Sequence, residues 1–368
     1  MKRILNNKTI FNIIILFILI EKNAYMMQDI IKEKNYFNDS DKTQGILLDK
    51  EESTIYNNGK IQNLNKVNQN SELISNGIES HKNIESLDNN GVILGRAEVI
   101  ESVNNVTNSG NGIALENLEI KFLKNNGYIN GSFIANDLID SSGNSGNGVN
   151  LIGNDTGQTQ MGAKIIGSKL DKIVNEGVIS GKVDSRNANR GLYNSGNAIN
   201  IAPKDLIGGS YYFKSEVGSF KNFGRVIGEA YIENQNSRNI GNGLTAFGSY
   251  ESKADEIVNQ GVIKGNVFSN LNIENSGNGI HLSSFGHFFG GDFITSKIEN
   301  KGIVEGEANT SALNFGSGNG IIIDGRGTQT KIENLENSGV ISGYSSKLNN
   351  EKSGNGVYSG YNITTLFN

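Results

Sequence analysis

The stretch LDNNGVILG, residues 87–95, carries a pattern that occurs seven times along the 368-residue chain. The pattern is apolar-x-Asn-x-Gly-x-(Ile or Val)-x-Gly, and successive copies lie 36 to 50 residues apart. Its asparagines are Asn89, Asn125, Asn175, Asn222, Asn259, Asn300 and Asn337. Glycine permits a tight turn, and the residues after it alternate apolar and polar as in a half-buried strand. Each copy therefore predicts a turn that leads into a short β-strand.

A second pattern, usually Ser-Gly-Asn-Gly-(Ile or Val)-x-apolar, follows each copy of the first. Its asparagines are Asn111, Asn147, Asn197, Asn242, Asn278, Asn319 and Asn355. This pattern also indicates a turn followed by a strand. We assign one coil to each pattern, so about seven two-coil Asn/Gly repeats predict fourteen coils.

Strands this short cannot bury their apolar faces alone, but coils stacked in parallel can bury them against one another. The predicted fold is therefore all-β, a parallel β-helix solenoid. Parallel crossovers are almost always right-handed, and we expect the same hand here. At about 4.8 Å between neighbouring strands, fourteen coils predict a rod about 65 Å long.

The recurring asparagines of the first pattern have two interpretations. In stacked coils each side-chain amide lies over its counterpart, so the amides can form a hydrogen-bonded ladder. Asparagine also tolerates the left-handed backbone of a tight turn, which would explain the recurrence without a ladder. We predict the ladder for all seven residues and keep turn chemistry as the alternative.

The remaining segments divide the chain into three parts. Residues 1–24 have basic residues followed by a short apolar run, which is typical of a signal peptide. Residues 25–54 are polar and lack the repeat, and we interpret them as a flexible leader. The β-helix is predicted over residues 55–368, where residues 55–80 hold a degenerate first repeat or cap.

Composition narrows the possible partners and cofactors. The net charge is −5 with both signs mixed along the chain, which does not favour nucleic acid binding. The chain has no cysteine, which excludes disulfides and thiolate metal sites. We expect no nucleic acid partner, no metal and no cofactor.

The Asn/Gly repeats resemble the passenger regions of autotransporters and related type V secreted surface proteins of Gram-negative bacteria. The resemblance covers roughly residues 55–360 and rests on the repeat motifs, the signal sequence and the missing cysteine. It implies an exported protein at the cell surface or outside the cell. It also implies adhesion, with a host or bacterial cell-surface protein or glycan as the partner. The barrel strands of an autotransporter are not found, so outer-membrane association would require a translocator region missing from this sequence.

Parallel β-helices also include polysaccharide lyases and hydrolases, so an enzyme of this class is the alternative function. The best local candidate is Asp324-Gly325-Arg326, although Asp-Gly is also an ordinary turn signal. The three histidines, His81, His281 and His287, match no metal or triad spacing, and we expect them at the surface. We predict no catalytic residues and no enzyme activity.

Aromatic residues gather in the variable segments that follow the second pattern in three successive repeats. They are Tyr211, Tyr212, Phe213, Phe247, Tyr250, Phe285, Phe288, Phe289 and Phe293. If the coils stack in register, these segments lie on one side of the rod and could form a binding patch. The alternative is that the rings pack back onto the helix. The sequence thus favours a non-enzymatic structural or adhesive module, with this patch as its candidate binding surface.

Overall fold

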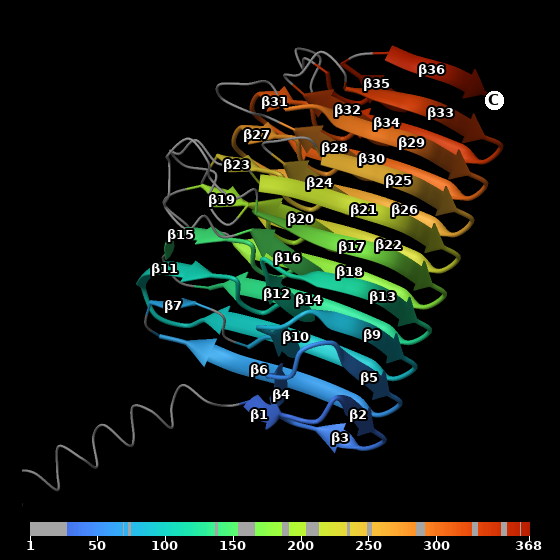
Figure 1. The fold of residues 1–368 in the computed structure, drawn as a ribbon. Coiled ribbons are helices and arrows are strands. Elements are labelled where there is room, and N and C mark those ends of the chain that lie inside the picture. Colours follow the sequence, from blue (N-terminus) through green and yellow to red (C-terminus); the bar gives the residue numbers. More distant parts are fainter. Residues whose placement is uncertain are drawn as a thin grey trace, which may run out of the picture.

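The computed structural model contains strands and turns, with no helix among the residues it describes. The described residues are 28–68, 70–72, 75–136, 139–153, 166–185, 191–203, 213–233, 236–248, 252–284, 291–325, 330–346, 352–360 and 362–368. Figure 1 shows their strands stacked in rungs from one end of the molecule to the other. The prediction of an all-β parallel β-helix is confirmed.

Within this part of the chain the strands form four sheets, which we name A to D, and every pairing in them is parallel. Sheet A consists of β1 (Gln28–Ile31), β4 (Gly45–Leu48), β8 (Ile78–Ser80), β12 (Ile113–Glu116), β16 (Val149–Gly153), β20 (Ile199–Pro203), β24 (Leu244–Gly248), β28 (Ile280–Ser284), β32 (Ile321–Gly325) and β35 (Val357–Ser359). Sheet B consists of β2 (Asn35–Asn38), β5 (Ser53–Asn57), β9 (Ile84–Asn89), β13 (Glu119–Asn125), β17 (Ile166–Asn175), β21 (Phe213–Asn222), β25 (Ser252–Asn259), β29 (Phe293–Asn300), β33 (Lys331–Asn337) and β36 (Asn362–Phe367).

Sheet C consists of β3 (Asp41–Lys42), β6 (Lys60–Val67), β10 (Val92–Val99), β14 (Tyr128–Ala135), β18 (Val178–Ser185), β22 (Arg225–Ile232), β26 (Val262–Ser269), β30 (Ile303–Thr310) and β34 (Val340–Ser345). Sheet D consists of β7 (Ser71–Glu72), β11 (Val103–Thr107), β15 (Ile139–Gly143), β19 (Leu192–Tyr193), β23 (Ser237–Arg238), β27 (Ile273–Glu274) and β31 (Asn314–Phe315).

One coil contains a strand from each of sheets B, C, D and A in that order, as in β13 to β16. Asn89 pairs in register with Asn125, and Ile113 pairs with Val149, one repeat further along in both cases. The prediction of two coils per repeat is therefore wrong. Each repeat makes a single coil because its two patterns form two different corners of that coil. The ten strands of sheet A, about 4.8 Å apart, give a rod about 45 Å long, shorter than predicted.

The β-helix begins before the predicted boundary. Strands β1 to β4 lie within residues 28–54, so the prediction of a flexible leader is wrong for these residues. Asn38 at the end of β2 is buried and donates from its Nδ2 to Oδ1 of Asn57 at 2.7 Å. The repeat pattern missed this coil because its turn lacks the glycine of later repeats. Residues 55–80 form the next coil, and the predicted signal peptide lies outside the described residues.

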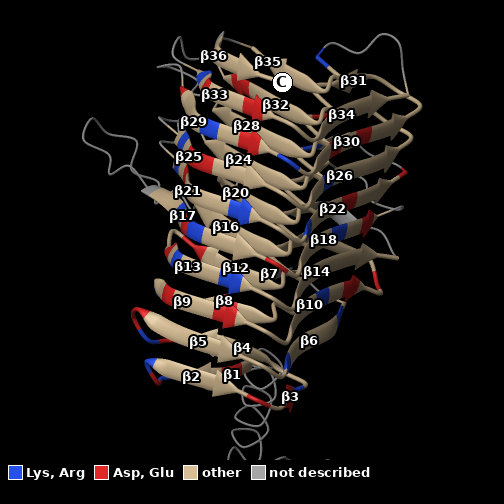
Figure 2. Cartoon of the chain, turned by 90° about the vertical axis from the view of Figure 1, so that its right-hand side faces the viewer, with Lys and Arg blue, Asp and Glu red and all other residues tan. Residues whose placement is uncertain are grey.

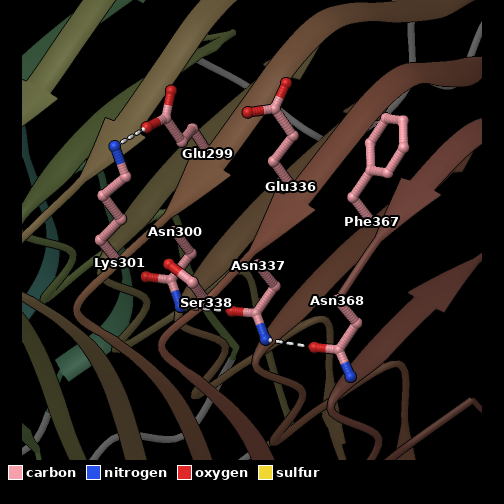
Figure 3. Close-up of a pocket in the computed structure, with 8 residues that line it drawn as sticks. All are labelled: Glu299, Asn300, Lys301, Glu336, Asn337, Ser338, Phe367 and Asn368. Carbon is pink, nitrogen blue, oxygen red and sulfur yellow. Dashed lines mark hydrogen bonds and ion pairs between the residues drawn. The ribbon is translucent and has the colours of Figure 1, made fainter.

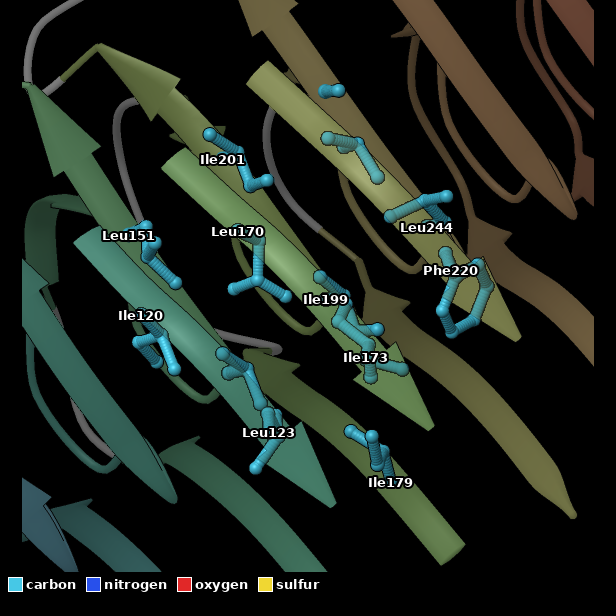
Figure 4. Close-up of a cluster of buried hydrophobic side chains, with 14 of the residues drawn as sticks. Ile120, Leu123, Leu151, Leu170, Ile173, Ile179, Ile199, Ile201, Phe220 and Leu244 are labelled. Carbon is cyan, nitrogen blue, oxygen red and sulfur yellow. The ribbon is translucent and has the colours of Figure 1, made fainter. Parts of the chain in front are cut away.

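The interior is divided into two apolar columns. The larger column lies between sheets A, B and C, with residues such as Leu151, Leu123 and Ile179 buried in it (Figure 4). The smaller column lies between sheet D and the second half of the sheet C strands, and it includes Phe133 and Val106. Every second side chain along a sheet C strand such as β14 points inward. The first half of the strand therefore contributes to the larger column and the second half to the smaller one.

The second glycine of the first pattern marks the border between the two columns. A Cβ on Gly131 would lie 1.8 Å from the carbonyl oxygen of Asn147, in the turn that precedes sheet A. This turn therefore packs directly against the middle of the sheet C strand. Only glycine permits that approach, which explains why this position is fixed in all seven copies.

Candidate functional site

The predicted asparagine ladder is present at the corner between sheets B and C. In each step Nδ2 of one asparagine donates to Oδ1 of the asparagine in the next coil, at 2.7 to 2.8 Å. The ladder joins all seven predicted residues: Asn89, Asn125, Asn175, Asn222, Asn259, Asn300 and Asn337. It continues to Asn57 and Asn38 at one end and to Asn368 at the other, as Figure 3 shows for the last steps.

Each ladder asparagine also organises the turn around it. Nδ2 of Asn259 lies 3.3 Å from the carbonyl oxygen of Gly261 and 3.0 Å from that of Ile303 in the next coil. The carbonyl oxygen of Asn259 accepts hydrogen bonds from the backbone amides of Lys301 and Gly302. Because the residue is buried, these bonds satisfy polar groups that water cannot reach. The column is a structural element, because the side-chain amides of its inner members bond to one another and to the backbone of their turns.

A second asparagine column, which the sequence prediction did not include, runs through the turn before sheet A. The backbone amide of Asn147 donates to Oδ1 of Asn111 at 2.9 Å, and that of Asn197 donates to Oδ1 of Asn147 at 2.9 Å. Here the side-chain oxygen accepts from a backbone amide, and in some coils also from the side-chain amide of the same residue, as Oδ1 of Asn242 does from Nδ2 of Asn278 at 3.2 Å. In the first column it accepts from a side chain. The recurring Gly-Asn pairs were visible in the sequence, but their spacing alone does not distinguish these two geometries.

The same turn uses two residues with positive φ. In one coil these are Asn144 and Gly146, at 54° and 68°, on either side of Ser145. Asparagine and glycine adopt this left-handed backbone at lower cost than other residues. Turn chemistry, the alternative interpretation of the first-pattern asparagines, therefore applies to Asn144 and its equivalents in this second turn.

The predicted aromatic patch is not exposed where the structure describes it. Phe213, Phe247 and Phe293 are buried, with Phe213 and Phe293 inside the larger apolar column. The patch prediction is therefore wrong for these three residues, whose rings do not face solvent: Phe213 and Phe293 fill the interior, and the ring of Phe247 packs beside that of His281 on the outer side of sheet A. The other six candidates lie outside the described residues: Tyr211, Tyr212, Tyr250, Phe285, Phe288 and Phe289.

Asp324, the candidate for catalysis, is held in a closed ion pair. Its Oδ2 lies 3.0 Å from Nζ of Lys352, and its Oδ1 accepts from the backbone amide of Gly325 at 2.9 Å. Burial is the largest single influence and lowers the pKa of Lys352, but the hydrogen bond to Asp324 and the attraction of its carboxylate together outweigh burial, so the pKa is raised. The lysine therefore stays protonated and is no general base. Arg326 lies outside the described residues.

The described histidines occupy opposite environments. His81 is exposed as expected, and its hydrogen bond to Glu79 at 2.9 Å raises its pKa. His281 is completely buried, so the expectation of a surface residue is wrong for it. Neither ring nitrogen of His281 has a hydrogen-bond partner, and burial lowers its pKa to about 3. His287 lies outside the described residues. Among those residues, no group of three or more His, Cys, Asp or Glu could hold a metal ion.

The outer face of sheet C presents a stripe of mostly apolar residues that the sequence analysis missed. We name it the sheet C stripe; its residues are paired in register at the start of seven successive strands: Val92, Tyr128, Val178, Arg225, Val262, Ile303 and Val340. Tyr128, Ile303 and Val340 are exposed by 37%, 40% and 53%. The position follows the first fixed glycine of each pattern and varies in residue type, so the copies align it, but only the structure shows that it faces outward.

Charged residues are scattered over the rest of the lateral surface. Lys, Arg, Asp and Glu lie interspersed over the strands in Figure 2. Many form pairs between neighbouring coils, such as Lys121 with Glu85 at 2.6 Å. The seven positions of the sheet C stripe hold no Lys, Asp or Glu, although the same register continues to Lys60 in β6.

No protein-family model, no curated protein and no solved structure matches this chain. Among the described residues, no helix is long and apolar enough to cross a membrane.

Proposed function

We propose that the chain is a non-enzymatic, rod-shaped repeat module that binds a protein partner through the sheet C stripe. The observation that carries this proposal is the alignment, over seven coils, of side chains that are mostly apolar and either exposed or half-buried. Contiguous apolar surface on a soluble protein favours an interaction site. Tyrosine and arginine are enriched in interfaces while Lys, Glu and Asp are depleted, and the stripe has this composition.

The environments of Asp324 and His281 support a non-enzymatic role. The acid is engaged by Lys352, and the imidazole is enclosed away from any substrate. An acid, a base and a charge stabiliser must converge on a reacting group for glycan cleavage. Asp324 and His281 do not form such a group, because the first is paired with Lys352 and the second is buried.

The proposed setting is the exterior or surface of a Gram-negative cell, with adhesion as the role. This part rests on the resemblance of the repeats to passenger regions. Of the two partner classes, a cell-surface protein fits the β-branched stripe better than a glycan does, because glycan sites rely on hydrogen-bonding groups. Attachment to the outer membrane would depend on a translocator region.

The proposal is tested with a double variant, Tyr128→Ser with Ile303→Ser, in a cell-binding assay with purified chain. We expect at least a severalfold loss of binding with an unchanged circular dichroism spectrum, because both side chains are exposed. Leu313→Ser is the matched control, since Leu313 is 64% exposed beside sheet D. Equal binding by the double variant and the control would contradict the proposed role of the stripe.

A further inference from the structure

Arg225 is the one charged residue of the sheet C stripe, and it occupies the middle position. Three stripe residues lie on each side of it, in the coils before and after. Its paired neighbours Val178 and Val262 are half-buried, whereas Arg225 is exposed. The residues that contribute most to binding cluster near the centre of an interface, and arginine is common among them. The charge therefore lies where a partner that covers the stripe would bury it.

A second departure from the repeat lies in the same coil. The residue after each ladder asparagine is polar in six of the seven copies of the first pattern and is Phe223 in the fourth. Phe223 is 44% exposed, and a single glycine separates it from Arg225. The residues that determine the fold of this coil, such as Asn222 and Gly228, keep the pattern. The two departures therefore change the surface of the coil and not its fold.

The guanidinium of Arg225 has no counter-charge within the described part of the chain. That part holds three arginines. Arg96 is paired with Glu98 at 3.2 Å, and Arg238 is paired with Glu274. Arg225 forms no such pair, although β18, β26 and the turns that lead into these neighbouring strands are described throughout. In the isolated chain its guanidinium therefore relies on water for its hydrogen bonds.

We propose that the partner of the sheet C stripe carries a carboxylate, the side chain of Asp or Glu set in an apolar surface, that pairs with Arg225. This inference rests on the proposed function, because it names the chemistry of the protein that the stripe binds. A partner that covers the stripe takes the guanidinium out of water, and a buried charge without a counter-charge is strongly unfavourable. The planar guanidinium donates two parallel hydrogen bonds to a carboxylate, which matches it better than a neutral acceptor does. Arg225 is thus the residue of the stripe that determines specificity.

A second copy of the chain does not supply this carboxylate to the whole stripe. In a contact between two stripes, Arg225 faces another stripe residue, and none of the seven is acidic. Asp41 lies in the same register two coils before Val92. It meets Arg225 of another copy only in registers that leave part of the stripe uncovered. The stripe therefore fits a different protein, in which an acidic residue interrupts an apolar surface.

The test selects short random peptides, displayed on phage, against the full folded chain. Peptides that bind the stripe are those that lose binding to the double variant Tyr128→Ser with Ile303→Ser. We expect these peptides to carry Asp or Glu between apolar residues. Arg225→Val should bind them roughly tenfold or more weakly, because a hydrogen-bonded pair between charged groups is lost. The variant should fold, since valine is the residue of both neighbouring coils, and circular dichroism checks this.

Arg96→Val is the matched control, because Arg96 is exposed on the same sheet and is already paired with Glu98. It should leave the affinity for the peptides unchanged. Arg225→Glu should bind poorly, and replacing the acidic residue of the peptide with Lys should restore binding to this variant, which a damaged fold would not permit.

Two results would overturn the inference while the proposed role of the stripe stands. They are stripe peptides without an acidic residue, and equal or tighter binding of these peptides by Arg225→Val, which adds apolar surface. Peptides that all bind the double variant as well as the unmodified chain would instead contradict the proposed function, and this inference with it.

Discussion

Two buried polar columns in this molecule follow different rules. At the corner between sheets B and C, asparagine occupies every coil, and each amide bonds to the next. On the outer side of sheet A, the corresponding positions hold Asn150, Asn200, Thr245, His281 and Ile322 in successive coils. Nδ2 of Asn200 donates to Oδ1 of Asn150 at 2.8 Å, but Thr245 and His281 are buried without partners.

The difference shows what keeps a position constant in a solenoid. In the corner ladder the partner of each side chain is the same residue one coil away, so a change in one coil leaves two neighbours unsatisfied. In the sheet A column the side chains bond to several partners or to none. A substitution in one coil therefore does not require a matching residue in the next coil. Repetition therefore marks mutual dependence between coils, and the following changes test that distinction.

The largest expected effect is the acid sensitivity caused by His281. Its pKa is about 3 in the folded chain and about 6.5 when unfolded. The unfolded state thus binds a proton as pH falls below 6.5, whereas the folded state stays neutral. Stability is then lost progressively between pH 6.5 and pH 3, by about 4 to 5 kcal/mol in total.

His281→Ile isolates this contribution, because Ile322 already occupies the equivalent position in the next coil. Its neighbours Thr245, Phe247 and Ile322 carry no charge that could stabilise a protonated ring. Urea unfolding at several pH values should show the gap between wild type and variant widening as pH falls. A gap that stays constant with pH would mean that His281 has the same pKa in the folded chain as in the unfolded chain.

Asn259→Ala tests the corner ladder at its centre. The change removes the donor to Asn300 at 2.8 Å and the acceptor of Nδ2 of Asn222. A buried group without its partner costs about 1 to 3 kcal/mol. Hydrogen exchange should accelerate in β25, β26 and the coils stacked on them, while Gln260→Ala should leave it unchanged. Exchange that matches in the two variants would indicate that the ladder contributes no net stability.

Thr245→Val tests the opposite case, a polar atom that the fold buries without a partner. The hydroxyl of Thr245 is buried and unbonded, and valine has nearly the same shape. Because the folded chain no longer has to enclose an unsatisfied hydroxyl, stability should rise by about 1 kcal/mol. A decrease in the denaturation midpoint would show that this hydroxyl has a bonding partner in solution.

The sequence predicted those features of the fold in which a residue bonds to the same residue one coil away, because such residues recur in every repeat. The fixed Asn and Gly positions predicted the stacked fold and the ladder from Asn89 to Asn337. The assignment of two coils per repeat failed because both turn patterns look alike in sequence, although they form different corners. The first coil at Asn38 was missed because its turn lacks glycine. His281 and the sheet C stripe lie at positions of the patterns where the residue type varies, so the sequence aligned them with their counterparts but did not show that one is buried and the others exposed.

The smallest expected effect separates burial from repetition. Asn90 follows Asn89 and also belongs to an amide series, because its Nδ2 donates to Oδ1 of Asn58 at 3.0 Å and its Oδ1 accepts from Asn126 at 2.7 Å. These bonds are exposed, so water replaces either partner. Asn90→Ala should change the free energy of unfolding by no more than about 0.5 kcal/mol. Asn89→Ala, with a buried side chain in the corner ladder, is the matched comparison measured by urea unfolding. If both changes cost the same, repetition of an amide in successive coils, and not its burial, would determine its contribution to stability.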